Sequence, residues 1–474
     1  MKSNNHTIAR FRSGLLSVSG IAAVLALAAP LASAQDKATL DLLVQKGVIT
    51  QADEDNVAKS AAAPIVVTPK DGAVKGLKLE GMIQAQFDDL STKANGPGSV
   101  SPTSTDEFLL RRVYLGALAD LGNGWNAEVL LDLAATDGSN QPSGGPGAAI
   151  PTTTGTLNTA LGQNQFEKVI ITKNFSDLDG TLGVGLRKVD FTQEEVTSSA
   201  TGKVIERSVV SRFFDESYGT STSGRLAFAD RHTGIFWNGT IPLVPGLYYS
   251  TALTDGVQND NVQFTNPGGL NRFGYWAALG YKGSIGGFKY DVGVNGGLSQ
   301  DQNSVNASQV TPTSTVNQAN TDIGYNPYVK LDVGNFELSA EFEQVDVDHG
   351  RGPAAGITNA NTSRVLPYGF NITPSYKITP EWELVARYSY LDTDGRGVAI
   401  KDVARDGINI ASTTLYNNVS SIYAGVNWYI VGTAVKWSNG YEFDDFYHSG
   451  VAGSGFTGPR AEVSGFRSQL QVTF

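Results

Sequence analysis

The chain ends on a regular alternation of apolar and polar residues. In residues 460–474 one face carries large apolar side chains and the other carries polar ones, with Phe466, Leu470, Val472 and Phe474 against Arg467, Gln469, Gln471 and Thr473. A period of two is typical of a strand that has one face in hydrocarbon and one in water. Because a free sheet edge inside a membrane leaves backbone groups without partners, we predict that this strand closes an outer-membrane barrel. An edge strand of a soluble β domain is the alternative interpretation.

The same kind of pattern recurs through the chain and gives sixteen candidate strands. They lie near 74–87, 108–120, 124–134, 165–174, 180–190, 231–241, 246–254, 272–283, 287–298, 325–333, 335–347, 364–377, 381–392, 416–430, 432–446 and 460–474. Short turns alternate with long polar loops, of which 88–107, 135–164, 299–324 and especially 191–230 are examples. This asymmetry predicts an all-β fold, a sixteen-stranded antiparallel transmembrane β-barrel that is wide enough for an aqueous channel and has both ends on the short-turn side.

The N-terminal region predicts export. Residues 1–34 combine early basic residues, an apolar run and the small-residue pattern Ala32-Ser33-Ala34, which together indicate a signal peptide. Residues 35–62 have the pattern of a short periplasmic helical hairpin, and residues 63–73 that of a linker. The barrel would then occupy residues 74–474.

Composition excludes several classes of protein. The chain has 35 basic and 46 acidic residues, a formal charge of −11, and loss of three basic residues with the signal peptide makes it −14. That balance argues against a nucleic-acid partner. The chain has no cysteine, and therefore no disulfide or thiolate site.

Strand parity places several cations toward the lumen. In the second strand Arg112 falls on the lumen face and Arg111 off it, while the other strands contribute Lys330, Arg387, Lys436 and Arg467. Arginine and lysine can bind and pass anions in a pore. Generic solvation of the lumen is the alternative, because the acidic residues Glu337, Glu341, Glu343 and Glu383 also face inward by parity.

The longest loop is a second source of cations. Residues 191–230 carry Lys203, Arg207, Arg212 and Arg225 among acidic residues, together with the apolar pairs Val209-Val210 and Phe213-Phe214. We predict that this loop folds against the barrel interior and forms the constriction. An extracellular lid is the alternative.

The sequence gives little support for an enzymatic function. Outside the signal peptide the histidines are His232, His349 and His448, and none accompanies a nucleophile motif. The acidic pairs that precede Gly395 and His349 lack the spacing of a calcium loop. We therefore expect no catalytic residue, no metal site and no cofactor.

Three segments resemble the phosphate-selective porin O and P family. They are FLLRRVYLGALADL (108–121), GLRKVDFTQEEVTSS (185–199) with IERSVVSRFF (205–214), and LYYSTALTDG (247–256). The resemblance implies a trimeric outer-membrane porin of a Gram-negative bacterium, in contact with lipid and lipopolysaccharide, whose basic residues guide anions. By position it assigns this role to Arg111, Arg112, Lys188 and Arg207.

The segments also depart from the family pattern. Tyr114 stands where a further arginine is expected, and Lys188-Val189-Asp190-Phe191 replaces a Lys-x-Pro-Phe piece. Both changes lower the positive charge near the expected constriction. The sequence thus predicts a passive channel for small anions such as phosphate or polyphosphate, with a general or cation-preferring porin, or a structural or surface-binding barrel, as alternatives.

Overall fold

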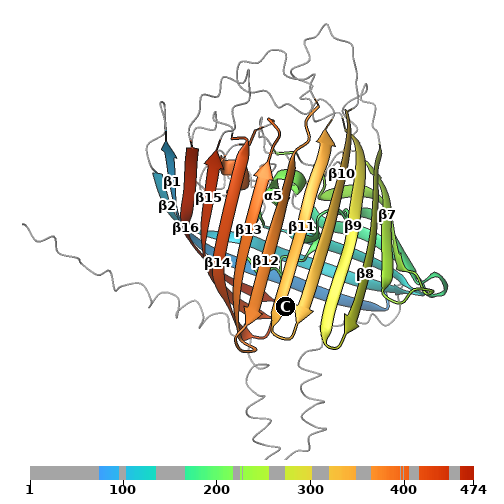
Figure 1. The fold of residues 1–474 in the computed structure, drawn as a ribbon. Helices are drawn as coiled ribbons and strands as arrows, with labels where there is room; N and C mark the ends of the chain where they lie inside the picture. The colour runs from blue at the N-terminus through green and yellow to red at the C-terminus, as the bar shows by residue number, and fades with distance from the viewer. Residues whose placement is uncertain are drawn as a thin grey trace, which may run out of the picture. The chain divides into compact units, whose positions relative to one another are not determined.

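A computed structural model describes residues 74–95, 103–134, 166–216, 225–226, 228–255, 273–301, 320–347, 364–395, 397–398, 400–404, 416–447 and 460–474. Sixteen antiparallel strands form one closed barrel in which each strand pairs with its neighbours in sequence (Figure 1). The predicted signal peptide, helical hairpin and linker lie outside the described residues.

All sixteen predicted segments form strands, and β1, β2 and β10 extend further than predicted at their long-loop ends. They are β1 Gly76–Asn95, β2 Thr103–Gly122, β3 Trp125–Asp132, β4 Phe166–Phe175, β5 Gly180–Lys188, β6 Arg231–Thr240, β7 Leu247–Asp255, β8 Phe273–Ile285, β9 Phe288–Asp301, β10 Asn320–Val333, β11 Phe336–Val347, β12 Tyr368–Lys377, β13 Trp382–Asp392, β14 Asn418–Val431, β15 Val435–Tyr447 and β16 Arg460–Thr473. The helical elements are η2 Ser176–Leu178, α4 Gln193–Val196, α5 Val209–Asp215 and α6 Ile400–Val403. None of these described helices is long and apolar enough to span a membrane. The predicted loop at 88–107 is largely strand, because the alternation continues through β1 to Asn95 and resumes at Thr103.

The last strand closes the barrel as predicted. β16 pairs antiparallel with β1 from Met82–Thr473 to Asn95–Arg460. Past the end of β16, the Phe474 N–H donates to Gly81 O at 3.0 Å, and the Gly81 N–H donates back to Phe474 O at 2.9 Å. The Phe474 ring lies against Gly81, where an added Cβ would sit 2.3 Å from the ring. Closure therefore extends to the final residue, whose side chain is exposed on the outer face.

The outer face is apolar and aromatic. Trp382, Leu384 and Tyr388 on β13 are exposed, as are Ile422 and Ile430 on β14. Trp382 stacks on Trp428 with ring centroids 5.3 Å apart. Exposed apolar surface of this extent is stable in lipid and not in water.

One predicted face is wrong, and a bulge is the reason. The pairing of β1 with β2 skips a residue, since Gln84 pairs with Arg112 and the next residue, Ala85, pairs with Leu110. The extra residue is Arg111, so strict alternation fails there and both arginines reach the lumen. On the long-loop side of the bulge the exposed apolar residues are Phe108 and Leu110 rather than Leu109.

Candidate permeation path

The long loop between β5 and β6 folds into the barrel, as predicted. We call residues 189–230 the inserted loop. Its helix α5 buries Val210, Phe213 and Phe214 completely, in one apolar cluster with wall residues that include Val345 and Leu391. Figure 1 shows α5 within the barrel, behind β11 and β12. Burial of several large apolar side chains holds the loop inside and makes the extracellular-lid alternative wrong.

A second apolar piece enters from the connection between β13 and β14. Helix α6 contributes Ile400, Val403 and Ala404 to the same cluster. Arg212 on α5 donates to the Val403 carbonyl, and Arg467 on β16 donates to the Ala404 carbonyl at 2.6 Å. The lumen beside β13 to β16 is therefore filled with protein.

The middle of the inserted loop is held by a regular set of hydrogen bonds. We call residues 199–206 the belt. Five neighbouring strands, β1, β16, β15, β14 and β13, each supply one side-chain donor to a belt carbonyl, in the pairs Gln84 to Ser199, Gln471 to Ala200, Lys436 to Gly202, Asn427 to Lys203 and Arg387 to Glu206. The belt thus runs across the strands and follows the inner wall from β1 to β13.

Two buried arginines reinforce this side of the lumen. Arg467 pairs with Asp88 at 2.6 Å and with Glu442 at 2.8 Å. Arg387 pairs with Glu194 at 3.1 Å and with Glu442 at 3.3 Å. Both guanidinium groups are fully buried and opposed by carboxylates, so their contacts are those of anchors for the loop.

Elsewhere cations exceed the carboxylates that pair with them. Lys188 and Arg207 both bind Glu195, and Arg111 and Arg212 both bind Glu206. Burial alone would raise the pKa of Glu195, but the charges of Arg207 and Lys188 outweigh burial and lower it to about 2. Glu195 is therefore ionised at any physiological pH, and its single charge faces two cations.

The remaining predicted cations occupy different settings. Arg112 is buried and donates to Gln84 Oε1 at 2.8 Å, and among the described residues it has no carboxylate partner. Arg225 is completely buried and pairs with Glu216 at 2.9 Å. Lys436 donates to the belt at Gly202, and Lys330 is half-buried on β10. Four of the nine candidates, Arg212, Arg225, Arg387 and Arg467, are thus buried in ion pairs with carboxylates.

The acidic residues predicted to face the lumen lie there. Glu341 and Glu343 on β11 are buried, and Glu341 accepts from the N–H groups of Gln193 and Glu194 at 2.7 and 3.0 Å. Glu383 and Glu337 both pair with Lys203 of the belt. Carboxylates therefore gather on the β11 to β13 side, opposite the cation excess beside β2 and β5.

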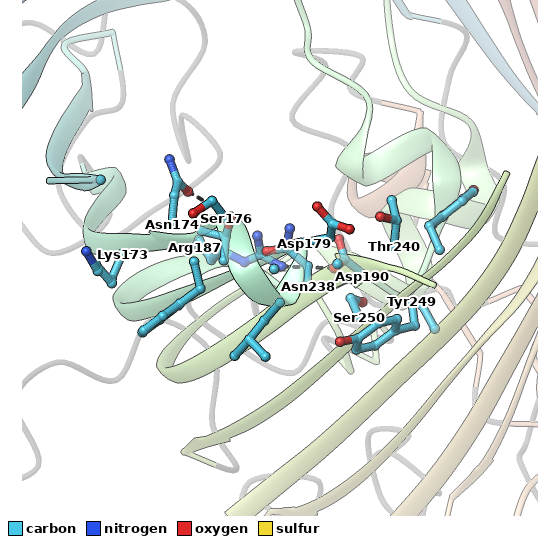
Figure 2. A pocket seen from close by; sticks show the side chains of 18 of the residues that line it. Lys173, Asn174, Ser176, Asp179, Arg187, Asp190, Asn238, Thr240, Tyr249 and Ser250 are labelled. Atoms are coloured by element: carbon cyan, nitrogen blue, oxygen red, sulfur yellow. Dashed lines mark hydrogen bonds and ion pairs between the residues drawn. The ribbon is translucent and has the colours of Figure 1, made fainter. Parts of the chain in front are cut away.

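Open space remains along the other wall. A cavity of about 1330 Å³ lies between the start of the inserted loop and strands β4 to β10, and it reaches the short turns (Figure 2). Arg187 and Asp190, 2.9 Å apart, lie on this cavity, and Lys282 of β8 also lines it. Sequence reasoning missed Arg187 and Lys282. The alternation along β8 could have placed Lys282 on the lumen face, because Leu279 and Tyr281 occupy the opposite, lipid-facing positions.

His232 contributes a structural contact rather than a catalytic pair. It is completely buried, and its Nδ1 lies 2.9 Å from the Asp255 carbonyl. Within the described part of the chain, no group of histidine and acidic side chains is arranged to hold a metal ion.

The sequence of residues 77–442 matches the family described as phosphate-selective porin O and P. The chain belongs to the phosphate-selective porin O and P family. It is an outer-membrane porin of the Gram-negative type, and a barrel of this family is a channel for passive diffusion.

One solved structure supports this fold, and a second is reported beside it. The outer membrane channel DcaP of Acinetobacter baumannii matches 86% of this chain and 100% of its own, with 13% identity and a TM-score of 0.52. OmpT of Vibrio cholerae matches 87% of this chain and 100% of its own, with 11% identity and a TM-score of 0.46. Comparison with curated protein sequences gave no match.

Proposed function

We propose that this porin conducts small anions, phosphate among them, past the cations at the start of the inserted loop. The main support for the proposal is that two cations share one carboxylate in each of two places. Lys188 and Arg207 both pair with Glu195, and Arg111 and Arg212 both pair with Glu206. Each group has one cation more than the carboxylates with which it forms ion pairs. These side chains are largely buried, and buried charge is screened less by salt than the acidic residues of outer loops.

The predicted cations then divide into two roles. Arg112, Lys188 and Arg207 lower the barrier for anions, and Lys330 adds positive charge on the β10 wall. Arg212, Arg225, Arg387 and Arg467 hold the loop, because each is buried with a carboxylate. Lys436 holds the belt through Gly202. No covalent step is required for this function.

The test is the reversal potential of the purified channel in a salt gradient. Arg112→Gln removes a lumen charge whose described partner is the neutral Gln84, and we expect the permeability ratio to shift toward cations. Arg364→Gln is the matched control, because it removes the same charge from an exposed pair with Asp346 just before β12. The control should leave the reversal potential unchanged.

Three results would change the proposal. A cation-selective wild type, or equal effects of the two substitutions, favours the general or cation-preferring porin. If phosphate blocks the chloride current no more strongly than sulfate does, the protein is still an anion channel, but phosphate is not its preferred solute.

We further propose a homotrimer embedded in lipid and lipopolysaccharide, on the strength of the family. Cross-linking of the purified porin in detergent tests the stoichiometry, and a single monomeric band at every cross-linker concentration contradicts it.

A further inference from the structure

The cavity beside β4 to β10 contains a cation without an acidic partner. The Lys282 side chain is exposed on the cavity, and its amine lies 5.4 Å from the ring centroid of Tyr248. Among the residues described here, no carboxylate lies within ion-pair distance of Lys282. An amine on open, water-filled space is available to a solute.

The cross-strand neighbours of Lys282 are a carboxylate on β9 and, beyond it, a second amine on β10. Asp291 on β9 is opposite Lys282 on β8 and also opposite Lys330 on β10. The Asp291 carboxylate accepts the Tyr248 hydroxyl at 2.5 Å. Two amines therefore flank one carboxylate that is already hydrogen-bonded.

Two tyrosines form a fixed floor for this space. The hydroxyls of Tyr248 and Tyr328 are hydrogen-bonded to each other. Glycines make room for the rings, since a Cβ on Gly280 would lie 2.3 Å from Tyr248 Cζ and one on Gly293 would lie 2.5 Å from Tyr328 Oη. The rings are therefore held flat against the wall before any solute enters.

Neutral hydrogen-bonding groups complete the lining. Asn238, Thr240 and Ser250 lie on the same cavity, and Figure 2 shows all three among the labelled side chains. Amides and hydroxyls both donate and accept, which suits hydroxyl groups of a solute. The cavity thus offers an amine that can bind the oxyanion group of a solute, and neutral side chains that can bind the hydroxyl groups of the same solute.

We propose that this cavity is a binding site for small hydroxylated oxyanions, with the phosphate or carboxylate group at Lys282 and the hydroxyl groups at the tyrosine and asparagine side. The site lies between the cations of the inserted loop and the short-turn end of the barrel. It deepens the proposed anion conduction and rests on it.

The experiment measures block of chloride current through the full-length porin in planar bilayers. Glucose 6-phosphate should block the wild type more strongly than inorganic phosphate does, because it engages both parts of the site. Lys282→Gln should raise its half-blocking concentration about tenfold, as expected for loss of one charge-assisted hydrogen bond. Tyr248→Phe should weaken block by glucose 6-phosphate more than block by inorganic phosphate.

Lys289→Gln is the matched control. Lys289 is exposed, pairs with Asp332 at 3.3 Å and does not line the cavity. Gluconate in place of glucose 6-phosphate separates a carboxylate preference from a phosphate preference. Heat-modifiable migration on gels verifies that each variant is folded.

The outcomes distinguish this site from the anion channel itself. Equal half-blocking concentrations for Lys282→Gln and Lys289→Gln overturn the site and leave anion conduction standing. Equal block of the wild type by glucose 6-phosphate and inorganic phosphate overturns the hydroxyl part of the site. A cation-selective reversal potential of the wild type overturns anion conduction independently of any block.

Discussion

Replacing Arg467 with methionine tests the anchoring of the inserted loop. Arg467 is completely buried between Asp88 of β1 and Glu442 of β15, and it also donates to Ala404 near α6. Methionine fills a similar volume but removes the charge. Glu442 retains Arg387, whereas Asp88 loses its guanidinium partner while it is only 3% exposed.

Removal of one partner from a buried ion pair costs about 3–5 kcal/mol, because the other charge remains buried without compensation. We therefore expect Arg467→Met to lower the free energy of unfolding by that amount. The assay is denaturant unfolding of the barrel in detergent micelles, followed by the gel shift between folded and unfolded forms. The double variant Arg467→Met/Asp88→Asn removes the uncompensated charge and should recover most of the loss.

Arg460→Met is the control on the same strand. Arg460 pairs with Asp445 at 2.6 Å, but its side chain is 56% exposed. An exposed pair contributes about 0–1 kcal/mol. Equal losses for the two methionine variants, or no recovery in the double variant, would refute the assignment of Arg467 as a buried anchor.

Two further predictions concern assembly and topology. Deletion of Phe474 removes the reciprocal hydrogen bonds with Gly81 and the ring that covers Gly81. We expect it to reduce the heat-modifiable folded band in outer-membrane fractions. Normal assembly of the shortened chain would contradict the role of the last residue in closure. Epitope tags inserted within 135–164 or 302–319 should be accessible on intact cells. A tag at Gly122-Asn123, in a tight turn between β2 and β3, should not be, and labelling of the turn alone reverses the orientation.

Much of the barrel was predictable because its main determinant is local. Alternation along a strand records which face meets lipid, and this pattern located all sixteen strands and the closing pair. The bulge at Arg111 was not predictable in this way, since an inserted residue leaves the composition of the strand unchanged. Because of the bulge, Arg111 lies on the lumen face and pairs with Glu206 of the inserted loop.

The site was less predictable than the fold. Parity correctly placed Arg112, Arg387, Lys436 and Arg467 inside, but it gave no information about which carboxylate each would meet. Arg467 and Asp88 are separated by 379 positions in the chain. The loss of free charge at Arg387 and Arg467, and the retained charge at Arg112, follow from tertiary contacts alone.

The belt has a consequence for how such a pore can change over evolution or by design. Its five attachments use main-chain carbonyls as acceptors, and a carbonyl is present whatever side chain a position carries. Apart from Lys203 and Glu206, which also form ion pairs through their side chains, belt residues can therefore be exchanged while the donors on the wall continue to hold the same path. A substitution at those positions of the belt can therefore change the groups that face the pore and leave the path of the main chain in place.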